Sequence, residues 1–136
     1  MKLLAKTFIE HGAFAEASEV QGTIAQLRPD DWAAQYDYAG TLSFVRRYND
    51  AISPIKRVIA PRPDHIPSYQ SAALIFTMMG RHAEAVPQTH KAAELGSSAA
   101  MFDMVRYYTE RLGIEKSDTE AFRWTNKLRK TAISWR

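Results

Sequence analysis

The sequence repeats a set of residue types every 34 positions, and this period constrains the fold more than any other feature. The repeated positions are Ala17, Ala51 and Ala85 in one column and Phe14, Tyr48 and His82 in another. A fixed period of about 20–50 residues is typical of solenoids, in which each unit buries its apolar face by stacking on its neighbours. The period therefore predicts stacked helix pairs, which offer a long curved surface rather than a closed pocket for chemistry.

The segments between the glycine and proline positions have the apolar spacing of helices. Helices are expected at about residues 1–10, 13–27, 31–46, 49–59, 67–79, 83–95, 98–111 and 119–134. Asp30 or Asp31 is expected to cap the third of these helices, and Asp118 the last one. Gly96 is expected to end a helix in the left-handed conformation. No segment has a strand pattern, so the sequence predicts an all-α fold.

The repeated columns resemble the tetratricopeptide repeat. The small residues that let paired helices approach closely would be Ala5, Ala39 and Ala73 in the first helices and Ala17, Ala51 and Ala85 in the second helices. Gly12 and Gly80 match the glycine of the turn, whereas Arg46 stands at this position in the second repeat. Tyr48 and Phe14 match the aromatic residue of the turn, and His82 departs from it.

From Lys91 onward the chain resembles the longer Sel-like variant of this repeat, with Tyr108, Ala121 and Trp124 at matching positions. The two resemblances cover nearly the whole chain. They imply an α-solenoid of about four antiparallel helix hairpins, wound as a right-handed superhelix in one domain. The repeats would span about residues 1–31, 32–65, 66–97 and 98–136.

Composition excludes several classes of function. The 136 residues include no cysteine, so the chain forms no disulfide and no thiolate metal site. No histidine pair has metal-binding helical spacing, and no phosphate-binding glycine loop or nucleophile motif is present. No apolar run approaches the ~20 residues that span a bilayer. We therefore expect a cytoplasmic, non-catalytic protein without cofactor or metal.

In tetratricopeptide arrays the first helix of each pair lines the concave groove where a protein ligand binds. Carried over to this sequence, the groove residues would be Lys2, Lys6, Tyr36, Phe44, Gln70, Leu74, Met78, Phe102 and Arg106. An apolar stripe rimmed by Lys and Arg favours an extended or helical peptide with acidic residues. The alternative is that Phe44, Leu74 and Met78 belong to the core.

Two other functions stay open. Basic residues crowd the C-terminus, at Arg123, Lys127, Arg129, Lys130 and Arg136, and could bind nucleic acid or an acidic partner. Nucleic acid is disfavoured, because only Trp124 and Trp135 are interleaved with them as stacking residues. Trp135 could also mark a self-association surface that makes a homo-oligomer. The chain could instead be a recruiting module excised from a larger enzyme.

Overall fold

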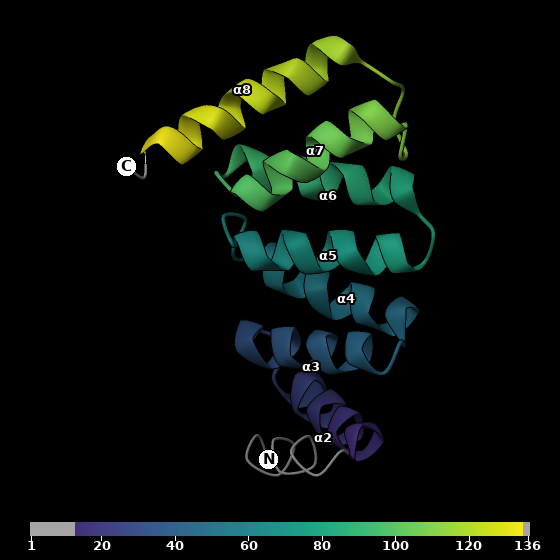
Figure 1. Cartoon of the computed structure of the whole chain (residues 1–136). Helices are drawn as coiled ribbons and strands as arrows, with labels where there is room; N and C mark the ends of the chain where they lie inside the picture. The colour runs from purple at the N-terminus through teal and green to yellow at the C-terminus, as the bar shows by residue number, and fades with distance from the viewer. Residues whose placement is uncertain (1–12, 135–136) are drawn as a thin grey trace. The chain divides into compact units, whose positions relative to one another are not determined.

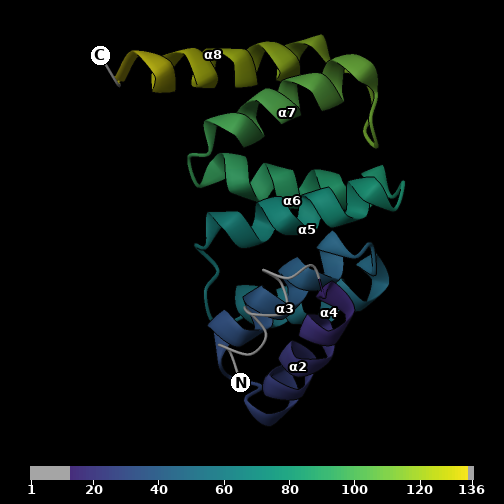
Figure 2. The same cartoon turned by 60° about the horizontal axis from the view of Figure 1, so that its bottom comes forward.

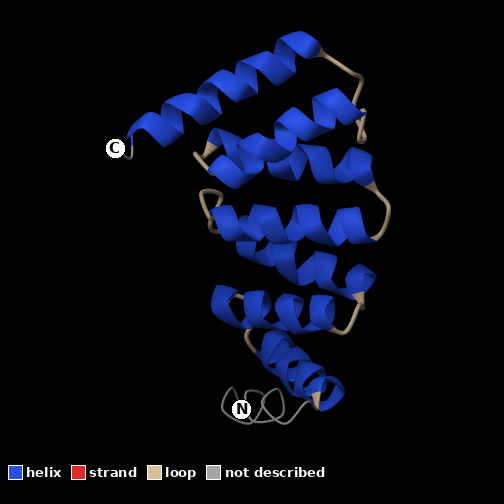
Figure 3. Cartoon of the chain, in the orientation of Figure 1, coloured by secondary structure: helices blue, strands red, loops and turns tan. Residues whose placement is uncertain are grey.

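The computed structural model describes residues 13–134, and their side chains as far as Thr131. Within this range the chain forms seven helices joined by short loops and contains no strand (Figures 1 and 3). The all-α fold class is therefore confirmed. The helix expected at about residues 1–10, including Ala5, lies outside the described residues.

The helices fall into two compact units, divided between Pro63 and Asp64. The first unit contains α2 (Phe14–Leu27), α3 (Trp32–Phe44) and α4 (Tyr48–Ile59). The second unit contains α5 (Ile66–Met78), α6 (His82–Glu94), α7 (Ser98–Glu110) and α8 (Asp118–Ser134). Each observed bound lies within two residues of the expected one. The arrangement as a single domain of four repeats stays a prediction.

Consecutive helices within each unit run in opposite directions and pack against each other (Figures 1 and 2). The alanine columns lie at these contacts. Ala17, Ala51 and Ala85 are each 0% exposed, and Ala39 is 1% exposed. A methyl side chain at each contact lets the two backbones approach closely, as the sequence predicts, and a larger side chain there would force the helices apart.

Short polar residues cap three of the helices. Asp31 caps α3, Ser97 caps α7 and Ser117 caps α8. The Asp31 carboxylate accepts a hydrogen bond from the Ala34 amide at 3.2 Å and so caps α3, as expected. The expected cap of α8 is wrong by one residue. Asp118 is the first helical residue, and the hydroxyl of Ser117 accepts from the Glu120 amide at 3.2 Å. A serine hydroxyl caps as well as a carboxylate, and Asp118 then stabilises the first turn through the helix dipole.

The ends of α3, α5 and α6 share one backbone geometry. Each helix is followed by a residue with positive φ: Arg46 at 65°, Gly80 at 73° and Gly96 at 107°. The next amide then donates back to a carbonyl of the last helical turn, which satisfies an otherwise unpaired acceptor. The left-handed C-cap expected at Gly96 is therefore confirmed.

A candidate peptide groove in the second unit

Three of the predicted groove residues, Gln70, Leu74 and Arg106, line one pocket of about 310 Å³ in the second unit. The pocket lies where α5 and α7 flank α6. Its remaining lining consists of Ala73, Thr77, His82, Thr89, Ala100, Asp103, Tyr107 and Leu112. The structure thus brings together side chains from α5 and α7, which the resemblance assigns to the first positions of two successive repeats.

The α5 wall of the pocket combines an apolar side chain with a polar one. Gln70 and Leu74 are four residues apart and therefore lie on the same face of the helix. Leu74 is 59% exposed, so its side chain is accessible to a partner. The Gln70 side-chain amide donates to the hydroxyl of Ser97 at 2.9 Å. This bond connects α5 to the residue that caps α7.

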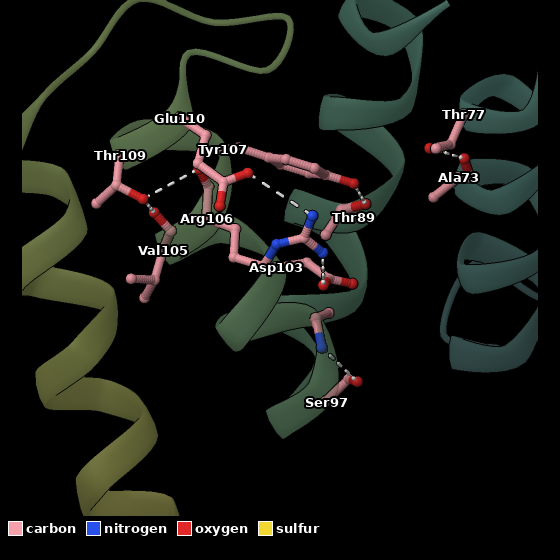
Figure 4. A network of polar contacts seen from close by, with 11 residues as sticks. Ala73, Thr77, Thr89, Ser97, Asp103, Val105, Arg106, Tyr107, Thr109 and Glu110 are labelled. Atoms are coloured by element: carbon pink, nitrogen blue, oxygen red, sulfur yellow. Dashed lines mark hydrogen bonds and ion pairs between the residues drawn. The ribbon is translucent and has the colours of Figure 1, made fainter. Parts of the chain in front are cut away.

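The floor of the pocket contains polar side chains, most of which have hydrogen-bond partners. The hydroxyls of Thr89 on α6 and Tyr107 on α7 lie 3.1 Å apart and form a buried hydrogen bond (Figure 4). This bond fixes the Tyr107 ring between the two helices. The Nδ1 atom of His82 is also buried, and among the described residues it has no hydrogen-bond partner. An unpaired buried polar atom is costly, so it could be satisfied by a bound group.

Charges gather on the α7 wall around Arg106 (Figure 4). Its guanidinium lies 3.6 Å from a carboxylate oxygen of Asp103 and 3.7 Å from one of Glu110. Burial raises the pKa of the Asp103 carboxyl above its ordinary value, and the attraction of Arg106 offsets this only in part. The single cation of the pocket wall is therefore shared between two carboxylates.

The other predicted groove residues do not line this pocket. Met78 on α5 and Phe102 on α7 are 54% and 55% exposed but lie outside its lining. Phe44 in the first unit is 67% exposed and stacks on Phe14, with ring centroids 4.3 Å apart. Tyr36 in the first unit is half-buried. The remaining two predictions, Lys2 and Lys6, lie outside the described residues.

These exposures also decide the alternative interpretation of the apolar stripe. Phe44, Leu74 and Met78 are all more than half exposed, so none of them is a core residue.

Several residues that line the pocket were not predicted from the sequence. Asp103 could have been found, because it stands three residues before Arg106 on the same helical face. Thr89 and Tyr107 have no such sequence signal, because their pairing depends on how α6 meets α7.

The first unit has a separate depression of about 760 Å³ formed by side chains of α2, α3 and α4. It contains none of the predicted groove residues. Arg47 at its edge is paired with Asp50 at 3.0 Å, and Gln35 in its floor donates to the backbone carbonyl of Ala25 at 3.0 Å. Because no predicted groove residue lines this depression, we do not consider it the candidate site.

Among the described residues, no three histidine or acidic side chains cluster closely enough to hold a metal ion. In the same part of the chain, every helix is too short or too polar to cross a bilayer.

No protein-family model and no curated protein sequence matches the chain. Solved structures of MamA are similar to it. A crystal structure of MamA aligns with a TM-score of 0.78 and 20% identity, over 98% of this chain and 77% of that one. MamA 41-end from Desulfovibrio magneticus RS-1 aligns with a TM-score of 0.76 and 16% identity, over 98% and 74%. At these identities the likeness establishes the fold, a tetratricopeptide-like helical solenoid.

Proposed function

We propose that this chain is a non-catalytic adaptor that binds a segment of another protein in the groove of its second unit. One observation supports this proposal above the others. Gln70, Leu74 and Arg106, chosen from the repeat pattern alone, line the same pocket between α5 and α7. These three side chains come from two different helices, so one bound segment could contact all of them.

The energetic reason for binding lies on α5. Leu74 and Met78 are four residues apart and both more than half exposed, so they form an apolar strip beside the pocket. Covering an exposed leucine with a partner stabilises a complex by about 1–2 kcal/mol. A polar group at the same site, such as Gln70, would then fix the orientation of the segment.

An acidic segment was expected from the sequence, and it stays a prediction that depends on Lys2 and Lys6. Among the described groove residues the only fixed cation is Arg106, and it already faces Asp103 and Glu110. An added carboxylate would have to compete with both.

The proposal can be tested with a library of random short peptides displayed on phage and selected against the full chain. Enriched peptides are then measured by fluorescence polarisation against the variant Leu74→Ser and the control Phe122→Ser. Phe122 on α8 is 66% exposed and lies outside the pocket lining. We expect Leu74→Ser to weaken binding by about tenfold and Phe122→Ser to leave it unchanged. Equal binding by both variants would overturn the groove as the site.

The basic last helix is a weaker candidate surface. Trp124 is 2% exposed and so cannot stack on a nucleic-acid base. Arg123 faces Glu120 at 3.5 Å, and Arg129 bonds to Asn126. Nucleic-acid binding stays a prediction, to be checked by the salt dependence of oligonucleotide affinity. Self-association, a role within a larger enzyme, the Sel-like assignment and a cytoplasmic location also stay predictions.

A further inference from the structure

We propose that the groove of the second unit accepts a basic side chain, lysine or arginine, from the bound segment, with Asp103 as its counter-charge. This inference rests on the proposed function and specifies the chemistry of the partner. The sequence suggests an acidic ligand, whereas this inference gives the ligand a basic group. Four features of the pocket lead to it.

The first feature is that the Asp103 carboxylate lacks a hydrogen bond. No donor among the described residues reaches it, and its nearest cation, Arg106 Nη1, is 3.6 Å away. Charge-assisted hydrogen bonds between guanidinium and carboxylate are shorter, about 2.7–2.9 Å. The Asp103 side chain is 42% exposed, so its acceptor positions are accessible to a donor from a ligand.

The second feature is the environment of this carboxylate. Burial raises the pKa of Asp103 above its ordinary value of 3.8, which means that the pocket disfavours the charged form. Arg106 lowers the pKa but does not cancel the effect of burial. A second cation placed at hydrogen-bond distance would stabilise the charged form of the Asp103 carboxyl.

The third feature is the balance of charge. Arg106 also faces Glu110, an exposed residue just outside the pocket lining, at 3.7 Å, so one guanidinium stands against two carboxylates. The one other titratable side chain of the lining besides Tyr107 is His82. A basic ligand group restores neutrality at this wall, whereas an acidic group would add a third negative charge.

The fourth feature is the shape and polarity of the pocket. Leu74 and Ala73 provide an apolar wall on α5, across from Asp103 on α7. Lysine and arginine pack their aliphatic stems on apolar surface while their charged heads reach a polar group. A volume of about 310 Å³ is large enough for one such side chain, together with part of the backbone that carries it.

The test uses the phage peptide selection against the full chain and reads the composition of the enriched peptides. We expect lysine or arginine at one shared position. For a synthetic peptide of the enriched sequence, Asp103→Asn should weaken binding by about tenfold. Arg106→Gln should strengthen it several-fold, because removing the competing cation frees both carboxylates. The control Glu120→Gln on α8 removes an equal charge outside the pocket and should change nothing.

Arg106→Gln distinguishes the two charge hypotheses, because it should strengthen the binding of a basic peptide and weaken the binding of an acidic one. Far-UV circular dichroism verifies that each variant remains folded, and selection against Asp103→Lys provides a second readout that should enrich Asp or Glu instead. This inference would be overturned if the enriched peptides required Leu74 but carried no basic residue, or if Asp103→Asn did not change their affinity. The proposal that the groove binds a protein segment would then still stand. A selection that enriches no peptide would overturn both proposals.

Discussion

The turn after α3 in the first unit and the turn after α5 in the second unit have the same backbone but different residues. Arg46 has a φ of 65° and Gly80 a φ of 73° at equivalent positions. In both turns the following amide donates to the carbonyl five residues earlier at 2.8 Å. The hydrogen bonds therefore hold the left-handed conformation in both turns, and glycine only lowers its cost, which is about 1–2 kcal/mol for other residues.

The loop between α7 and α8 needs glycine for a different reason. Gly113 has a φ of 75°, and a Cβ built on it would lie 2.5 Å from the carbonyl carbon of His82. Nothing lies within 4 Å of the Cβ position at Gly80. One glycine is therefore favoured by conformation alone, and the other by conformation and by close approach to the start of α6.

The largest effect is expected for Gly113→Ala. We expect a loss of about 3 kcal/mol in the free energy of unfolding, because a methyl group would collide with backbone that cannot move aside. Urea-induced unfolding measures it. Gly40→Ala is the matched control: it lies inside α3 with open space around it and should be stabilising by up to about 1 kcal/mol. A loss no larger than that of Gly80→Ala would contradict the steric explanation.

Gly80→Ala is expected to cost less, about 1 kcal/mol, because alanine must adopt positive φ but meets no neighbour. The same unfolding experiment measures it. An effect as large as that of Gly113→Ala would mean that an unrecognised contact exists at this turn.

Arg46→Gly is expected to stabilise the first unit by about 0.5 kcal/mol. It removes the strain at positive φ, and the greater freedom of glycine in the unfolded chain offsets part of the gain. Arg46→Ala is the control for the lost charge and should change the free energy of unfolding very little. If the two variants were equally stable, the backbone of this turn would not be strained.

The smallest effect is expected in the pH dependence of the free energy of unfolding. It compares the wild type with Asp103→Asn in the second unit, which replaces the carboxylate by a neutral side chain of the same shape. Because the pKa of Asp103 is raised in the folded state, the folded protein binds a proton more readily than the unfolded chain. Asp103→Asn should therefore be slightly more stable than wild type at pH about 7. The difference should vanish as the pH falls through the raised pKa to below 3.8. Unfolding at both pH values measures it, and a gap that widens in acid would contradict the raised pKa.

The helices could be predicted because the period fixes which face of each helix is buried, and Ala17, Ala51 and Ala85 mark that face directly. The resemblance to tetratricopeptide arrays also implied a groove that includes Gln70, Leu74 and Arg106, and these three side chains line one pocket. The sequence could not place the cap of α8, since Ser117 and Asp118 are both good capping residues and the choice depends on where the loop from Gly113 enters. It also could not show that Met78 and Phe102 fall outside the pocket.

The sequence by itself determined the fold class and the helix bounds, because these follow from local periodicity and small-residue spacing. The spacing within α7 already brings Arg106 near Asp103 and Glu110. The tertiary structure decided which side chains meet across helices. The hydrogen bond between Thr89 and Tyr107 and the partial burial of Asp103 arise only when α7 packs on α6, because these contacts join helices that are separate in the sequence.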